Sequence, residues 1–515
     1  MSGKRSIMTG TRSFGAVTLA LVVVTLLIRL PALLHPEPID DEAMYSVVAN
    51  EILAGGHAYT DAVERKPPLI FWTYAAIFGV AGEFNWPALH ASAVVWVLLT
   101  MAALCVIGRH LFDWETGMIA ALLYSIFQPW GTWKNLAFNG EVLMNLPVVL
   151  AWMIALGPSR ARHRPELLLA GALLCGAFLL KQPAAIAAVP LPFYFLLRDY
   201  RASRRLTPFD SMIQIGLLAL GFVGVLALVV GVLYAQGALG EAVYWTIGDH
   251  DIPQIFWRRG VEHTLAFAGA CLPLLLGAAI ALRDDKHWAG KHAERMAIVA
   301  LLVVSAIGTA ASGRFYPHYY IQLIPPLALL AAPSFRRLWA GTAAPPTWLL
   351  KPSTTWSWLA FTLVAFSFAH WHGLASQREP SEAGRYVLGH SSPEDRIFVW
   401  GQAAPIYLAA HRRPASRYIT SFPLTGYIFG NSAPDVDTRS RIVPGAWANL
   451  ATDFDRHPPA FIVDAQNDPG VRYRVEDFPL MTRLLAERYH PVARTADGEV
   501  YEMNGHAQHP TPAPR

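Results

Sequence analysis

The sequence predicts a polytopic α-helical membrane protein that ends in a small α/β domain, and three observations carry this prediction. The chain of 515 residues is 54% hydrophobic and only 15% charged, whereas ordinary soluble domains are about 25% charged. Long apolar runs recur over the first 371 residues. The composition then changes, and residues 372–515 contain short β-rich runs separated by helical stretches.

About eleven apolar runs are candidate membrane spans, since a helix needs roughly 20 residues to cross a bilayer. They lie near 14–34, 87–108, 116–130, 142–157, 166–180, 183–198, 212–235, 263–282, 296–311, 319–334 and 354–371. Several are short or interrupted by proline. The run 69–81 is shorter still, which is typical of an interfacial or re-entrant helix.

Lysine and arginine in the loops predict how the chain is oriented. They gather in alternate loops, at 160–164, 198–205, 283–295 and 336–351, which fall on the same side as the basic N-terminus. Because cytoplasmic loops carry the excess of basic residues, we expect a cytoplasmic N-terminus in a multi-pass protein of the inner (cytoplasmic) membrane. An odd number of spans then places the tail, residues 372–515, on the outer face.

The expected organisation is therefore a transmembrane domain, 1–371, followed by an extracytoplasmic α/β domain, 372–515. In the tail, 396–400 and 460–464 are predicted strands, and Asp497-Gly498 marks a hairpin. The tip from about Gly505 is predicted to be disordered. Three cysteines in apolar runs give no disulfide framework and no metal spacing, and the net charge of +4 gives no sign of nucleic-acid binding.

The acidic loop, residues 35–86, is the part of the chain that carries chemistry. It holds eight carboxylates and leaves the membrane directly after the first span. Asp40 or Asp41 stands where a helix begins, so one of them could simply cap that helix. The alternative is a general base facing a cavity at the membrane edge. Lys66, before Pro67-Pro68, is either a snorkelling lysine or a fixed cation that meets a phosphate.

Two motifs in this chain resemble those of a known family. The first is Asp41-Glu42-Ala43-Met44-Tyr45 followed by Lys66-Pro67-Pro68-Leu69; the second is Ser312-Gly313-Arg314-Phe315-Tyr316-Pro317-His318. Their order and predicted outer location resemble the GT-C membrane glycosyltransferases. The resemblance is strongest to the aminoarabinose-to-lipid A transferases and the protein O-mannosyltransferase-like enzymes of glycosyltransferase family 39. It covers roughly residues 10–370 in topology.

The resemblance implies roles for particular residues. Asp41 would be the catalytic base, and Glu141 in the second outer loop is the candidate for a second catalytic carboxylate. Lys66 would contact the phosphate of a polyprenyl-phosphate sugar, with Arg314 and His318 as further phosphate ligands. The remaining candidates for substrate binding are Asp40, Glu42, Tyr45 and Asn139.

The implied reaction is a one-step inverting transfer. Asp41 takes the proton of an acceptor hydroxyl, and the polyprenyl phosphate leaves with its charge stabilised by cations. The acceptor could be a lipid, a glycan or a protein. Arg65 stands where related transferases carry a metal-binding glutamate, so no cofactor is assigned and a divalent metal stays open. Asp249-His250-Asp251 is either a metal or sugar ligand or, as the spacing favours, a solvated turn.

Two other classes of function compete with the transferase. A transporter or flippase would place ionisable residues at the middle of the membrane and carry repeated, broken helices. Lys181-Gln182-Pro183 is the main interruption of that kind, and no inverted repeat is evident. An assembly scaffold would use the tail as its working part, which leaves the acidic loop and Lys66-Pro67-Pro68 unexplained.

Overall fold

The computed structural model describes residues 11–35, 37–39, 41–157, 164–203, 208–248, 255–339, 352–375, 381–432 and 436–506. The chain divides into two compact units. The first comprises Met1–Pro36, His90–Val229 and Ile255–Ser376, and the second comprises Glu37–Leu89, Val230–Gln254 and Gln377–Arg515. The division into domains at residue 371 stays a prediction. The second compact unit contains both most of the acidic loop and the tail.

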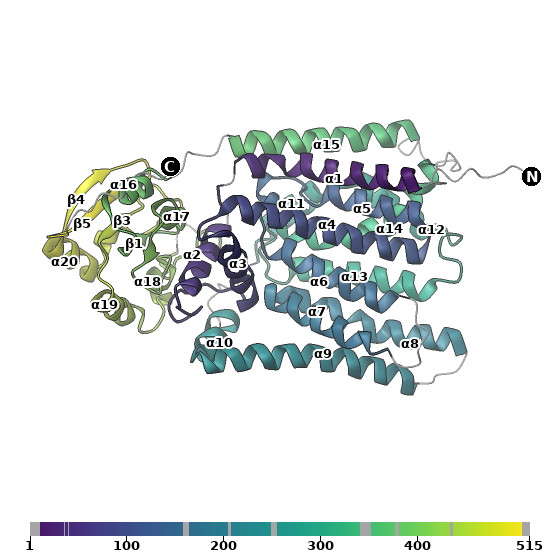
Figure 1. The fold of residues 1–515 in the computed structure, drawn as a ribbon, viewed down its shortest axis with the longest axis horizontal. Helices are drawn as coiled ribbons and strands as arrows, with labels where there is room; N and C mark the ends of the chain where they lie inside the picture. The colour runs from purple at the N-terminus through teal and green to yellow at the C-terminus, as the bar shows by residue number, and fades with distance from the viewer. Residues whose placement is uncertain are drawn as a thin grey trace, which may run out of the picture. The chain divides into compact units, whose positions relative to one another are not determined.

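The first unit is built of helices, and the longest of them run roughly parallel to one another in Figure 1. Their bounds are α1 Thr11–Leu34, α4 Trp86–Leu111, α5 Trp114–Phe127, α6 Gly140–Leu156, α7 Glu166–Leu180, α8 Pro190–Ser203, α9 Pro208–Ala235, α11 Trp257–Ala270, α12 Leu272–Arg283, α13 His292–Ala310, α14 Ile324–Trp339 and α15 Pro352–Ala375. Three 3₁₀ segments, η1 Trp133–Leu136, η2 Gln182–Ala188 and η3 Pro317–Leu323, connect them.

By length and composition, the described residues contain fewer membrane-spanning helices than the eleven spans expected. Within the described residues four helices meet that requirement by length and composition, namely Gly15–Leu34, Trp86–Leu111, Phe209–Ala235 and His292–Ala310. The pair α11 and α12 would add a fifth span, although it bends by 76° between Ala270 and Leu272. Four further apolar helices, α3 (Pro68–Ala81), α5, α6 and α7, are shorter.

Proline explains much of this difference. Proline cannot donate the backbone hydrogen bond that continues a helix. The run 183–198 accordingly becomes η2 followed by α8, which begins at Pro190, and the run 319–334 begins in η3 before α14. The α7 helix has 15 residues and rises about 1.5 Å per residue, so it is shorter than the roughly 30 Å hydrocarbon core.

The second unit begins with a helical pair from the acidic loop. The α2 helix, Glu42–Leu53, ends just before Gly55, whose φ of 92° suits glycine. The α3 helix, Pro68–Ala81, begins at its second proline. Edge-to-face contacts of Tyr45 with Phe71 and Tyr74 join the two helices, with ring centroids 6.1 and 5.7 Å apart. The short α10 helix, Leu239–Ile247, belongs to the same unit.

A five-stranded sheet forms the centre of the tail, in the order β2-β1-β3-β5-β4. The strands are β1 Arg396–Trp400, β2 Arg413–Pro414, β3 Phe461–Asp464, β4 Tyr489–Arg494 and β5 Glu499–Met503. The helices around it are α16 Glu382–His390, α17 Pro405–Ala410, α18 Phe422–Thr425, α19 Ala446–Arg456 and α20 Pro479–Arg488, with 3₁₀ turns η5 Arg439–Arg441 and η6 Val475–Asp477. β1 pairs in parallel with β2 and β3, and β5 is antiparallel to β3 and β4.

Specific contacts hold the acidic loop against the tail inside the second unit. Arg396 binds both oxygens of Glu51, at 2.9 and 3.2 Å. The backbone N–H of Val63 donates to the carbonyl oxygen of Arg417 at 2.8 Å. The rings of Phe84 and His411 stack, with centroids 4.9 Å apart. A bidentate Arg–carboxylate pair fixes orientation as well as distance, so the sheet positions α2 and the residues that precede it.

Candidate functional site

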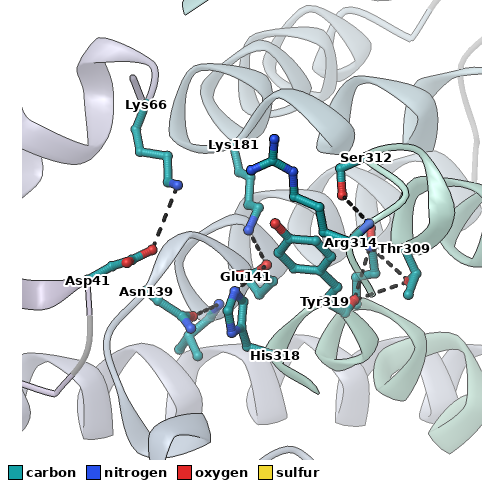
Figure 2. Close-up of polar contacts among 12 residues, drawn as sticks. Asp41, Lys66, Asn139, Glu141, Lys181, Thr309, Ser312, Arg314, His318 and Tyr319 are labelled. Atoms are coloured by element: carbon teal, nitrogen blue, oxygen red, sulfur yellow. Dashed lines mark hydrogen bonds and ion pairs between the residues drawn. The ribbon is translucent and has the colours of Figure 1, made fainter. Parts of the chain in front are cut away.

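The two residues given the leading roles from sequence lie together in the second unit. The Nζ atom of Lys66 lies 3.7 Å from Oδ2 of Asp41 (Figure 2). The side chains are 26% and 30% exposed, respectively. The ion pair is therefore long and partly open, which leaves both charged groups accessible to a ligand. Such a pair contributes little to stability, so its partners are available for chemistry.

Asp41 stands at the N-cap of α2 without capping it. Its carboxylate accepts no capping hydrogen bond and accepts instead from the hydroxyl of Tyr45, at 3.0 Å. Glu42 binds the backbone before the helix, because its Oε2 accepts from the N–H of Ile39 at 2.7 Å. The capping alternative therefore describes Glu42 better than Asp41. Glu42 and Tyr45 are both buried, which suits them to holding Asp41 rather than to contacting a substrate.

The backbone around Lys66 is fixed from two directions. The hydroxyl of Tyr59 donates to the carbonyl oxygen of Lys66 at 2.7 Å. Pro67 is extended, with φ −63° and ψ 157°, and α3 begins at the next residue. Tyr59 itself has a φ of 74°, which is uncommon for a residue with a side chain. These constraints limit where the Lys66 ammonium can reach.

A second polar cluster lies in the first unit, around Glu141 (Figure 2). Glu141 is buried and forms an ion pair with Lys181, whose own side chain is 11% exposed. The Nε2 atom of His318 lies 3.8 Å from the same carboxylate oxygen. The Lys181 ammonium also lies 4.5 Å from the centroid of the Tyr319 ring. Three sequence segments thus bring a carboxylate, an ammonium and an imidazole together.

Local sequence makes this cluster possible. Asn139 caps α6, because its side-chain oxygen accepts from the N–H of Val142 at 3.4 Å. Gly140 leaves room for Lys181, since a Cβ there would come within 2.9 Å of the lysine Cδ. Asn139 was expected to bind substrate, and the structure gives it this capping bond. Glycine is needed at position 140 because Lys181 approaches it closely, and not because of its backbone conformation.

Arg314 and His318 differ in their surroundings. Arg314 is 7% exposed, and its backbone N–H donates to the hydroxyl of Ser312 at 3.4 Å. His318 stacks on Tyr316, with ring centroids 5.6 Å apart, and Arg259 lies 4.9 Å from the centroid of the same Tyr316 ring. His318 is thus joined to the Glu141 cluster, and a second cation, Arg259, stands beside this loop.

Sequence reasoning missed the pairing of Lys181 with Glu141, since it considered Lys181 only as an interruption of the kind that a transporter would carry. The available signal was its position before Gln182-Pro183, between two apolar runs, where a charge needs a partner. Asp40 and the sequence Asp249-His250-Asp251 lie outside the described residues. Within the described ranges, no group of three or more His, Cys, Asp or Glu side chains could hold a metal ion.

Comparisons with known proteins point to a common fold. Residues 65–233 match a family model described as dolichyl-phosphate-mannose-protein mannosyltransferase. No curated protein matches the chain by sequence. ArnT from Cupriavidus metallidurans in the apo state is similar in structure, with a TM-score of 0.65 and 13% identity, over 95% of this chain and 98% of that chain.

Two further solved structures agree with this comparison. ArnT from Cupriavidus metallidurans bound to undecaprenyl phosphate gives a TM-score of 0.60 at 13% identity, over 96% of this chain and 98% of that chain. An oligosaccharyltransferase from Archaeoglobus fulgidus in the apo form gives 0.53 at 12% identity, over 89% of this chain and 70% of that chain. At these identities the similarity establishes a shared fold.

The Glu141–Lys181 pair yields a prediction about stability. Lys181→Met should lower the melting temperature of the purified protein in detergent, because it leaves the buried carboxylate of Glu141 without its ammonium. Loss of one partner of a buried pair typically costs about 3–5 kcal/mol. Glu141→Gln combined with Lys181→Met should recover much of that loss, since no unpaired charge remains. Equal melting temperatures for the wild type and Lys181→Met would contradict this account.

Proposed function

We propose that this chain, which has the GT-C fold of membrane glycosyltransferases, transfers a sugar from a polyprenyl-phosphate carrier to an acceptor at the outer face of the cytoplasmic membrane. The observation that carries the proposal is the Asp41–Lys66 pair, with 3.7 Å between carboxylate oxygen and ammonium. The reaction needs a base for the acceptor and a cation for the departing phosphate. These two residues supply both, at one place and partly open to a ligand.

The proposed chemistry is a single displacement. Asp41 accepts the proton of the acceptor hydroxyl as that oxygen forms a bond to the anomeric carbon. The bond between the anomeric carbon and the phosphate oxygen breaks, and the polyprenyl phosphate leaves with the electron pair. Lys66 offsets the negative charge that develops on this leaving group. Attack from the side opposite the phosphate inverts the anomeric configuration.

The hydrogen bond from Tyr45 supports a fixed direction for the base. The Tyr45 hydroxyl holds Oδ2 of Asp41, and the Tyr45 ring is buried against α3. A base held by a packed side chain loses little freedom when the acceptor arrives, which favours catalysis by positioning. Glu141 remains the candidate for the second carboxylate. Its burial against Lys181 favours a role in positioning Lys181 and His318.

A lipid-linked donor suits the expected orientation. The sequence predicts that the acidic loop lies outside the cytoplasm, where cytosolic nucleotide sugars are absent. A polyprenyl phosphate can present a sugar at that leaflet. ArnT of Cupriavidus metallidurans was solved with undecaprenyl phosphate, which supports a lipid phosphate as the carrier here.

The role of Asp41 is tested by exchanging its carboxylate for an amide. Asp41→Asn should lower sugar transfer by at least about a hundredfold, since a general base typically contributes about 10²–10⁴-fold. The protein should still fold, because Glu42 rather than Asp41 binds the backbone before α2. Asp40→Asn is the matched control and should cost much less. The activity of both variants is measured as transfer from a synthetic polyprenyl-phosphate sugar, at equal levels of protein in the membrane. Wild-type activity in Asp41→Asn would show that Asp41 is not the base.

The role of Lys66 is tested at limiting donor. Lys66→Ala should reduce donor use about ten- to a hundredfold, because hydrogen bonds to charged groups contribute about 1.5–3 kcal/mol. Lys66→Arg should retain part of the activity, since the guanidinium carries the charge in a different geometry. Arg65→Ala is the control, because Arg65 lies over the Phe422 ring, 5.1 Å from its centroid. Normal donor use by Lys66→Ala would contradict phosphate binding by Lys66 and favour the alternative of a snorkelling lysine.

The proposed orientation is tested by thiol labelling in intact cells. The three native cysteines are buried, so an introduced cysteine reports alone. Thr452→Cys on α19 should react with a membrane-impermeant reagent before lysis, after permeabilisation of an outer membrane where one exists. His110→Cys, at the end of α4 and on the expected cytoplasmic side, should react only after lysis; both side chains are exposed. The reverse pattern would invert the orientation.

A further inference from the structure

A cavity of about 310 Å³ lies in the second unit, and Asp41 is part of its wall. On one side are residues before and within the first turn of α2, including Pro38 and Met44. On the other side are the loops that follow β1 and β3, including Gln402 and Asn467. β1 and β3 are parallel neighbours whose ends, Trp400 and Asp464, pair directly. Crevices beyond the carboxyl ends of parallel strands are common ligand sites.

The loops on the sheet side are held in place by carboxylates. Asp468 accepts from the backbone N–H of Gln402 at 2.5 Å and from that of Gly470 at 2.9 Å. Asp497 accepts from the hydroxyl of Ser381 and from the N–H of Ala383, both at 2.9 Å. A Cβ on Gly470 would come within 2.5 Å of the Gln402 Cβ, so the two loops approach closely. The wall of the cavity is therefore built before any ligand arrives.

The charged residues in the described wall of the cavity are all acidic. Asp41, Asp468 and Asp497 line it, and the described residues of its wall include no lysine, arginine or histidine. Lys66, which pairs with Asp41, is not part of this wall. A phosphate or carboxylate between the two loops would therefore meet Asp468 and Asp497 as like charges, which is unfavourable. Hydroxyl groups, in contrast, can donate to these carboxylates and to the amide oxygens of Gln402 and Asn467.

An apolar surface stands among these polar groups. Phe429 lines the cavity and is 46% exposed, and Met44 lines it from α2. A sugar ring has hydroxyls at its edge and C–H groups on its faces, so it can satisfy the carboxylates and amides while one face packs on an aromatic ring. The volume lies at the lower end of the range of about 300–1,000 Å³ typical of small-ligand sites. That volume suits a short carbohydrate segment.

We propose that this cavity binds an uncharged sugar residue of a glycan acceptor and presents one of its hydroxyls to Asp41. The inference rests on the proposed function and narrows its acceptor from lipid, glycan or protein to a carbohydrate without phosphate at the reacting end. The proton of the bound hydroxyl passes to the Asp41 carboxylate, and the hydroxyl oxygen forms the new glycosidic bond as the polyprenyl phosphate leaves. Gln402 and Phe429 set which acceptor enters.

Kinetics with the full-length protein in proteoliposomes test this assignment. The donor is a synthetic polyprenyl-phosphate sugar, and the acceptor is an envelope extract from cells that lack the gene. Gln402→Ala and Phe429→Ala should each raise the KM for the acceptor about tenfold, which corresponds to about 1.4 kcal/mol, while kcat falls much less. Leu480→Ala is the control for loss of an exposed apolar side chain on α20 and should behave as the wild type.

Treatment of the extract identifies the class of acceptor. Periodate, which cleaves vicinal diols of sugars, should abolish acceptance, whereas phosphatase or protease should leave it intact. Loss of acceptance after phosphatase or protease would overturn the inference, as would an unchanged acceptor KM in both variants. A wild type that transfers no sugar to the untreated extract would instead overturn the proposed function itself.

Thiol labelling gives a readout that does not require activity. Ala403→Cys places a thiol in the wall of the cavity. A cationic methanethiosulfonate should modify it faster than an anionic one, because three carboxylates line the same cavity. Asp468→Asn combined with Ala403→Cys should narrow the difference between the two rates. Faster reaction with the anionic reagent would show that the cavity accepts acidic groups and would contradict an uncharged acceptor.

Discussion

The ion pair between Asp41 and Lys66 is the interaction on which the proposed site depends. A base and a phosphate-binding cation act together only when both stand at the same reacting bond. In the chain, a whole helix, α2, lies between Asp41 and Lys66. The pair is formed because α2 and α3 pack through Tyr45, Phe71 and Tyr74, with Lys66 fixed just before α3 by Tyr59. At 3.7 Å and partly exposed, it is loose enough for a substrate to enter.

The tail gives this helical pair its rigidity. Glu51 at the end of α2 is held in two hydrogen bonds by Arg396 at the start of β1, and Val63 is bonded to the backbone at Arg417. The same strands that hold α2 end at the cavity beside Asp41. In the proposed site, the α/β sheet thus supports α2, which follows Asp41, and supplies the wall against which an acceptor would lie.

The sequence was sufficient where local chemistry decides the structure. The apolar run 69–81 and the helix expected to begin at Asp40 or Asp41 correspond to α3 and α2, and the β-rich runs of the tail correspond to β1 and β3. It was insufficient where partners come from distant segments. Composition cannot tell that Lys181 pairs with Glu141 or that Gln402 faces the same cavity as Asp41. The number of membrane spans stays a prediction, because proline breaks shorten helices without making them polar and leave short apolar helices such as α7.

The proposed reaction requires that a sugar leaves its lipid carrier on this protein. The direct measurement follows a labelled sugar on a synthetic polyprenyl phosphate in proteoliposomes, with an envelope extract supplied outside. We expect the label to move to an acceptor in the extract, free polyprenyl phosphate to accumulate in equal amount, and the anomeric configuration to invert. Intact labelled lipid that changes leaflet without losing its sugar would contradict the account and favour a lipid transporter.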